Sequence, residues 1–168
     1  IHISDGSQPV GRGIGPALEA RDVLAVLARS PYAPVDLRDR ALHIAGALLD
    51  LAGTERSGRA LAAETLDSGR AQSKFESICQ AQGGRRTPAI APHQAPILSS
   101  TDGRVATVDN RALARLAKLA GAPHDAAAGI DLHVRLGERV SRGQPLLTVH
   151  AQTPGELEYA LDFHARRP

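Results

Sequence analysis

The sequence predicts an α+β protein in which a helical first half is followed by a half that mixes strands and helices. Apolar residues recur every three to four positions through the first half, which is the period of a helix. Beyond residue 96 they alternate with polar residues, which is the period of a half-buried strand. Between the two patterns, residues 83–96 hold two glycines, three prolines and little apolar periodicity, which is typical of a linker.

The first half begins with a strand-like stub at residues 1–4 and a loop at residues 5–15 that holds four glycines. A helix is expected to begin at Pro16, because proline lacks the N–H that would stay unpaired at the first helical position. One face of this helix is expected to be buried, and consists of Ala17, Ala20, Leu24 and Leu27.

Three more helices are expected before the linker. The second opens at Asp36 and is expected to bury Leu37, Ala41, Ile44, Leu48 and Leu51. The third begins at Ser57 and stops near Gly69. The fourth runs over residues 70–82 and is expected to turn Ala71, Phe75 and Ile78 inward.

In the second half, strands at residues 97–100 and 104–108 are expected to form a hairpin around a Thr-Asp-Gly turn. Asp109 is a candidate cap for the helix that follows. Alternation predicts a strand at residues 130–134, and residues 146–150 form another. Thr153 and Glu156 have the spacing of a capping box, with Pro154 at the first position of the last helix.

Composition excludes several classes of function. A net charge of +2 is too weak for a nucleic-acid-binding stripe, and 2% aromatic residues leave no stacking platform. No apolar run approaches the roughly 18 residues that a membrane helix needs. Seven histidines show no short ligand spacing and Cys79 is the single cysteine, so we expect no metal site, no internal disulfide and a cytoplasmic location. The absence of methionine suggests a piece of a longer protein.

The glycine loop is the sharpest local motif and has two interpretations. Backbone N–H groups of Gly11, Arg12 and Gly13, with the dipole of the following helix and the Arg12 cation, could hold an anion such as phosphate. The spacing matches neither a dinucleotide fingerprint nor a P-loop, and a tight turn from strand to helix explains the glycines equally well.

A second motif lies at residues 136–146, where a glycine-bounded basic turn joins two strands. It resembles the corner of biotinyl and lipoyl carrier domains and indicates a barrel-sandwich type of β architecture. Those carriers attach their cofactor to a lysine at a hairpin tip. Lys74 and Lys118 both fall on predicted helices, so a swinging-arm function is disfavoured, although an independent carrier or phospholigand-binding module stays the alternative.

Two long blocks resemble one enzyme family. They are DGSQPVGRGIGPALEARDVL, from residue 5 to 24, and LAGAPHDAAAGIDLHVRLGERVSRGQPLLTVHA, from residue 119 to 151. Both are similar to the thymidine phosphorylase and pyrimidine-nucleoside phosphorylase family, especially to its longer branch that includes archaeal AMP phosphorylases. Shorter matches at residues 66–71, 74–75 and 81–84 stand between them in the same order.

The resemblance implies the C-terminal third of a longer enzyme. Residues 1–84 would be the helical end of its central α/β domain, residues 85–96 a linker, and residues 97–168 a C-terminal α/β-hammerhead, barrel-sandwich-like domain. The implied activity is reversible phosphorolysis, in which a nucleoside or nucleotide and phosphate, the co-substrate, give a base and a pentose 1-phosphate. The resemblance further implies a homo-oligomer and no cofactor besides phosphate as co-substrate, while the composition predicts no nucleic-acid partner and no membrane partner.

The resemblance carries no catalytic residue onto this chain, because the family's phosphate loop and base-binding groups lie upstream of the matched segment. One positional expectation remains. Asp5, Gly6 and Ser7 would end a strand that edges the cleft, since ligands of open α/β sheets bind at the carboxyl ends of strands.

Overall fold

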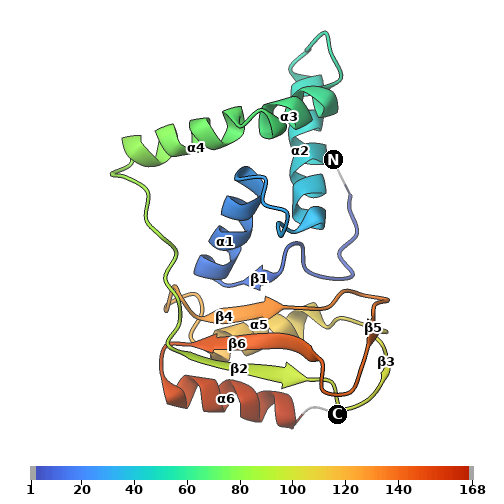
Figure 1. Ribbon diagram of the computed structural model, residues 1–168, viewed down its shortest axis with the longest axis vertical. Helices are drawn as coiled ribbons and strands as arrows, with labels where there is room; N and C mark the ends of the chain where they lie inside the picture. The colour runs from blue at the N-terminus through green and yellow to red at the C-terminus, as the bar shows by residue number, and fades with distance from the viewer. Residues whose placement is uncertain (1–2, 167–168) are drawn as a thin grey trace. The chain divides into compact units, whose positions relative to one another are not determined.

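The computed structural model describes residues 3–166 and confirms the α+β class (Figure 1). Its elements, in chain order, are β1 (Gly13–Ile14), α1 (Pro16–Leu27), α2 (Val35–Leu51), α3 (Gly58–Asp67), α4 (Arg70–Ala81), β2 (His93–Leu98), β3 (Gly103–Arg104), α5 (Asn110–Leu119), β4 (Gly129–Leu132), β5 (Arg139–Val140), β6 (Pro145–Ala151) and α6 (Pro154–Ala165).

The chain divides into two compact units, which we describe separately. Unit 2 consists of Asp22–Thr87, and unit 1 consists of the residues before and after it. The boundary therefore falls inside α1, and the glycine loop groups with the C-terminal half of the sequence. The predicted division at residues 84 and 96 concerns the domains of a longer enzyme and stays a prediction.

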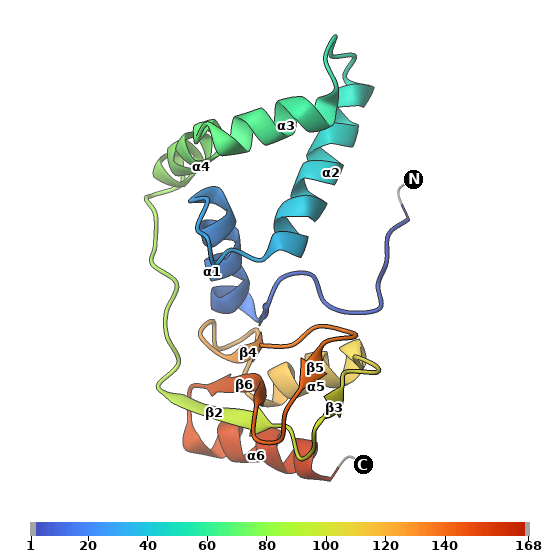
Figure 2. The ribbon, with the colours of Figure 1, turned by 45° about the vertical axis from the view of Figure 1, so that its right-hand side comes forward.

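Unit 1 is built on a four-stranded antiparallel sheet in the order β1-β4-β6-β2, with a second sheet made of β3 and β5 (Figures 1 and 2). The register places Ile130 of β4 opposite Ile14 on one side and opposite Val149 of β6 on the other. As predicted, Ile130, Leu132 and Val134 are buried while the residues between them are less so. Helices α5 and α6 pack on the face to which these side chains belong.

The helix starts predicted at Asp109, Thr153 and Ser57 are confirmed, whereas α2 begins at Val35, one residue before the predicted Asp36. The Asp109 carboxylate accepts a hydrogen bond from the N–H of Ala112, at 2.9 Å. Thr153 and Glu156 form the capping box, in which each side chain accepts from the other residue's N–H. In unit 2, Ser57 caps α3. These polar groups satisfy helix N–H groups that have no partner within the helix.

Unit 2 contains the end of α1 and the helices α2, α3 and α4. Helices α2 and α3 approach closely where Gly46 lies against Gly58, because a Cβ atom on Gly58 would lie 2.1 Å from the Gly46 carbonyl oxygen. The fully buried apolar residues of this unit's cluster are few: Val26, Leu42, Ala62 and Leu66.

The predicted hairpin at residues 97–108 is wrong. β2 pairs with β6 instead. The predicted second strand is reduced to the two residues of β3, Gly103 and Arg104, which pair with β5. The reason is that the 137–143 turn captures the segment. The Asp102 carboxylate accepts from the N–H of Arg142 at 2.8 Å, and the Ser99 carbonyl accepts from the N–H of Gly143 at 2.8 Å.

Three predicted buried faces also need correction. In α2, Ile44, Leu48 and Leu51 are 49%, 62% and 83% exposed, because the close approach to α3 turns Leu42 and Gly46 inward instead. In α4 no residue is fully buried, and Ile78 is 46% exposed. In α1 the fully buried apolar residues are Ala17, Leu18 and Val26, rather than Ala20, Leu24 and Leu27.

Candidate functional site

The predicted cleft-edge residues Asp5, Gly6 and Ser7 form an exposed turn. The Asp5 carboxylate accepts from both the N–H and the hydroxyl of Ser7, each at 2.9 Å. The side-chain amide of Asn110 donates to the Gly6 carbonyl at 2.8 Å and so ties the turn to the start of α5. The preceding strand was wrongly predicted for residues 3 and 4, while residues 1 and 2 lie outside the described part of the chain. Substrate contact at this turn stays a prediction.

The predicted anion-binding residues Gly11, Arg12 and Gly13 lie at the edge of the main sheet. The Arg135 guanidinium donates to the Gly11 carbonyl at 2.8 Å, and the N–H of Leu132 donates to the Arg12 carbonyl at 2.9 Å. Gly13 pairs with β4, and a Cβ atom there would lie 2.4 Å from the Leu18 carbonyl carbon. The glycines therefore permit a close packing of backbone on backbone.

The first N–H groups of α1 are also engaged. The N–H of Gly15 donates to the Glu19 carboxylate at 3.1 Å, and the N–H of Ala17 donates to the Ala126 carbonyl at 2.9 Å. A carboxylate at a helix N-terminus occupies the place and the favourable field that an added anion would use. This geometry favours the turn interpretation, and anion binding by Gly11, Arg12 and Gly13 stays an untested prediction.

Sequence reasoning missed the residues that hold the glycine loop in place. The Gln8 side-chain carbonyl accepts from the N–H of Leu136 at 2.8 Å, and Arg135 reaches Gly11 as described. These partners are 128 and 124 positions apart in the sequence, so no local pattern could have paired them. They join the loop to the basic turn that the sequence had singled out separately.

A polar group lies on the face of the main sheet opposite its core. It consists of Asp131 on β4, His133 just after that strand, and Thr148 and His150 on β6. Asp131 pairs with Thr148 across the two strands, and the His133 ring Nε2 lies 2.7 Å from the Thr148 hydroxyl. The alternation of residues 130–135 predicted the outward direction of Asp131 and His133, whereas His150 had no such signal.

His150 is the most unusual member of this group, because it is only 7% exposed and neither ring nitrogen has a hydrogen-bond partner. Burial lowers the pKa of its imidazole, and the charges of Arg21 and His133 lower it further, while Asp131 opposes the change. Burial therefore favours the neutral form of the ring. A neutral imidazole can accept a proton, but no nucleophile is hydrogen-bonded to this one.

Two carboxylates lie close together, Asp125 in the loop after α5 and Glu156 in the first turn of α6. Burial, and then the neighbouring Glu156, raise the pKa of Asp125, whereas hydrogen bonds from Thr153 lower the pKa of Glu156. Asp125 therefore takes up a proton more readily than Glu156 as the pH falls. Within residues 3–166, no group of three or more His, Cys, Asp or Glu side chains has an arrangement that could hold a metal ion.

The lysines and the helices bear on two other predicted functions. Lys74 lies in α4 and Lys118 in α5, so neither stands on the 136–146 turn where a carrier domain would present one. Across residues 3–166, none of the helices combines the length and the apolar composition needed to cross a membrane.

Comparison with known proteins gives two kinds of match. Residues 104–165 match the family model described as the pyrimidine nucleoside phosphorylase C-terminal domain. The chain is 58% identical to Putative thymidine phosphorylase 1 of Acidovorax sp. (strain JS42), with 100% of this chain and 33% of that protein covered. It is 59% identical to the Putative thymidine phosphorylase of Chelativorans sp. (strain BNC1), with 97% and 32% covered.

The matched model and the α+β fold define residues 104–165 as a pyrimidine nucleoside phosphorylase C-terminal domain. The chain belongs to the thymidine and pyrimidine-nucleoside phosphorylase family. It spans about a third of the length of the curated relatives that it matches.

Proposed function

We propose that this chain is the C-terminal, supporting portion of an enzyme that carries out reversible phosphorolysis of thymidine or a related nucleoside or nucleotide. The observation that carries the proposal is the extent of the similarity. A protein named as a putative thymidine phosphorylase is 58% identical over the whole of this chain, so both units take part in the match. In this proposal the enzyme is a cytoplasmic homo-oligomer that uses phosphate as co-substrate and no other cofactor.

The proposed reaction exchanges one bond at the anomeric carbon of the pentose. A phosphate oxygen forms a bond to that carbon while the bond to the base nitrogen breaks. The electron pair leaves with the base, which takes up a proton to give the free base and a pentose 1-phosphate. Such a transition state needs cationic or hydrogen-bonding groups around the phosphate and the departing base.

The resemblance carries no such group onto this chain, and the lysines and the glycine loop supply few. Both lysines lie on helices, and the glycine loop offers its carbonyls to Arg135 and Leu132 and its Gly15 N–H to Glu19. We therefore place the catalytic groups in the two thirds of the relatives' length that this chain does not cover. The role of this portion would be to hold the glycine loop against the C-terminal sheet and to support the fold of the whole enzyme.

Phosphorolysis assays test this proposal. The preceding portion of the Acidovorax relative fused to this chain should release base from thymidine, uridine or AMP when phosphate is added. The chain alone should release none. Turnover by the chain alone would contradict the placement of the catalytic groups, and an inactive but folded fusion would contradict the proposed reaction.

A further inference from the structure

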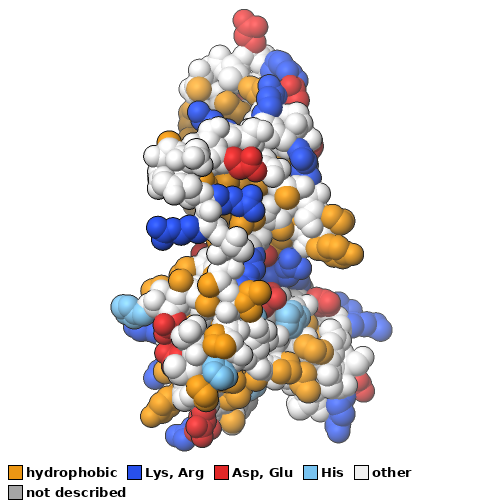
Figure 3. Space-filling view, turned by 60° about the vertical axis from the view of Figure 1, so that its left-hand side comes forward, with side chains coloured by type: hydrophobic (Ala, Val, Ile, Leu, Met, Phe, Trp, Pro, Cys, Tyr) orange, Lys and Arg blue, Asp and Glu red, His pale blue; other side chains and the backbone are white. Residues whose placement is uncertain are grey.

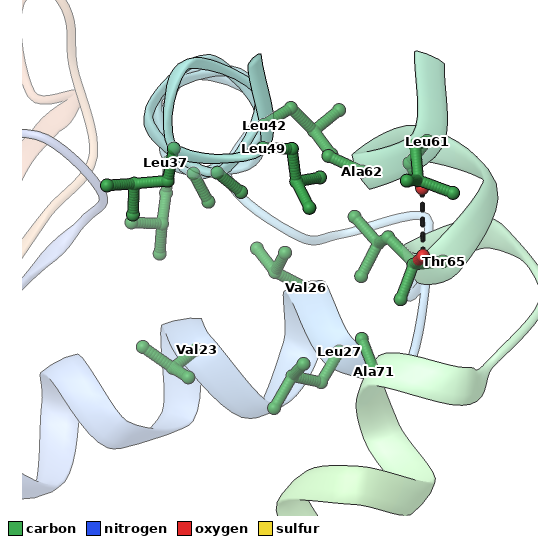
Figure 4. Close-up of a pocket in the computed structure, with 14 residues that line it drawn as sticks. Val23, Val26, Leu27, Leu37, Leu42, Leu49, Leu61, Ala62, Thr65 and Ala71 are labelled. Carbon is green, nitrogen blue, oxygen red and sulfur yellow. Dashed lines mark hydrogen bonds between the residues drawn. The ribbon is translucent and has the colours of Figure 1, made fainter. Parts of the chain in front are cut away.

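The helices of unit 2 surround an apolar groove with a volume of about 600 Å³ (Figure 4). In Figure 4, Val26 of α1 points toward α2, and Leu37 and Leu49 of α2 point toward α1 across it. We call this the aliphatic groove, and its lining residues are Val23, Val26, Leu27, Leu37, Ala41, Leu42, Ala45, Leu48, Leu49, Leu61, Ala62, Thr65, Leu66 and Ala71.

The lining leaves little for a polar ligand to bind. Thr65 is its one residue with a polar side chain, and that hydroxyl already donates to the Leu61 carbonyl at 2.8 Å. A nucleoside, a phosphate or a peptide backbone would lose hydrogen bonds to water here without gaining any from side chains. The groove therefore fits the aliphatic side chains of another segment.

The mouth of the groove carries apolar side chains that nothing in unit 2 covers. Leu48 is 62% exposed and Val23 is 41% exposed. Leu48 belongs to the apolar stripe of α2 that runs from Leu37 to Leu51, and the helical period of that stripe predicted that it would be buried. Hydrophobic side chains also reach the surface at several places on the face of the molecule that Figure 3 shows.

We infer that the aliphatic groove is the docking site for an aliphatic helix face from the preceding portion of the phosphorylase polypeptide. The relatives supply that portion, because about two thirds of their length lies outside the match to this chain. The groove also continues the small apolar cluster of unit 2, so its occupant would complete a core, as segments of one polypeptide or of an obligate complex do. Side chains at helical positions i, i+3 or i+4 and i+7 match such a groove.

This inference rests on the proposed function only for the identity of the polypeptide. It is tested by the reactivity of a cysteine placed at the groove. Cys79 is first replaced by serine, and Leu48→Cys is then made both in the free chain and in the fusion with the preceding portion of the Acidovorax relative. We expect maleimide to label Leu48→Cys at least tenfold more slowly in the fusion.

Val35→Cys is the matched control. Val35 lies on the same helix, is 71% exposed and does not line the groove, so it should react at similar rates in both proteins. Equal rates for Leu48→Cys in a folded fusion would overturn the inference. Protection of Leu48→Cys in a fusion that shows no phosphorolysis would support the docking site and contradict the proposed function. Phosphorolysis without protection would support the proposed function and contradict the docking site.

Co-expression of the two portions as separate polypeptides gives a second test that does not depend on the fusion. A tagged chain should retain the preceding portion, and Leu48→Asp should reduce that retention at least tenfold. Val35→Asp should leave it unchanged. Equal retention by the two variants, or retention by neither the wild-type chain nor the variants, would contradict the docking site.

Discussion

The two units differ in how much of their apolar surface they cover themselves. Unit 1 has twelve buried residues in its core cluster, and the side chains of Ile130 and Val149 have no exposed surface. Unit 2 has four buried residues in its cluster and an open groove beside them. The sheet of unit 1, covered by α5 and α6, is therefore a core that assembles within this chain. The helices of unit 2 have the apolar stripes of a larger core.

The largest expected effect is a truncation in the core of unit 1. Ile130→Ala removes buried methyl groups and leaves a cavity, so we expect a loss of about 2–5 kcal/mol in free energy of unfolding. Leu48→Ala in unit 2 removes a mostly exposed side chain and should change it by about 0.5 kcal/mol or less in the free chain. Urea unfolding followed by circular dichroism measures both. Similar losses for the two variants would remove the distinction between the units.

A second prediction tests the close contact between α2 and α3 in unit 2. A Cβ atom on Gly58 would lie 2.1 Å from the Gly46 carbonyl oxygen, so Gly58→Ala should push α2 and α3 apart and cost about 1–3 kcal/mol. Gly155→Ala is the matched control, because Gly155 also lies in the first turn of a helix but has no atom within 4 Å of an added Cβ. It should be neutral or slightly stabilising. Equal unfolding midpoints for the two variants would argue against the close approach.

A smaller effect is expected from the helix caps. Thr153→Ala removes the two hydrogen bonds of the Thr153 hydroxyl in the capping box of α6, to the Glu156 carboxylate and from the Glu156 N–H, and should lower the free energy of unfolding of unit 1 by about 1 kcal/mol. Ser57→Ala in unit 2 removes a single cap bond of 3.5 Å, so its cost should be smaller. Thermal unfolding of the two variants, each followed by circular dichroism, gives the comparison. A larger loss from Ser57→Ala would contradict the geometry of the two caps.

Much of unit 1 could be predicted from the sequence because its signals are local. Alternation at residues 130–134 gave both the strand and its buried side, and Asp109 and Thr153 marked the starts of two helices. The partners of β2 and β3 could not be predicted in this way. The pairing of these strands depends on hydrogen bonds between distant residues, such as Arg142 and Asp102, which are 40 positions apart.

The predicted faces of unit 2 were wrong for a physical reason rather than through a misread period. The stripe from Leu37 to Leu51 does follow a helix, but a glycine contact turns a neighbouring face of α2 toward α3. The glycine loop, as a candidate site, could be interpreted from the sequence only in part, for a different reason. The glycines of the loop were visible in the sequence. The bonds that hold the loop in place, from Arg135 to Gly11 and from Leu136 to Gln8, join residues 124 and 128 positions apart and left no local signal.

The smallest expected effect concerns His150 and the pH dependence of unit 1. Burial and the charges of Arg21 and His133 lower the pKa of this imidazole, while the Asp131 charge partly offsets them. The unfolded chain therefore takes up a proton more readily than the folded one near pH 6.5, the ordinary histidine pKa. The stabilising contribution of neutral His150 is present above that pH and is lost as the pH falls toward the folded pKa. The urea midpoint should thus decrease as the pH is lowered from 7.5 to 5.5, and His150→Gln should make that decrease smaller. The same slope in the variant would assign the pH dependence to other groups and leave the buried imidazole without a part in the stability of unit 1.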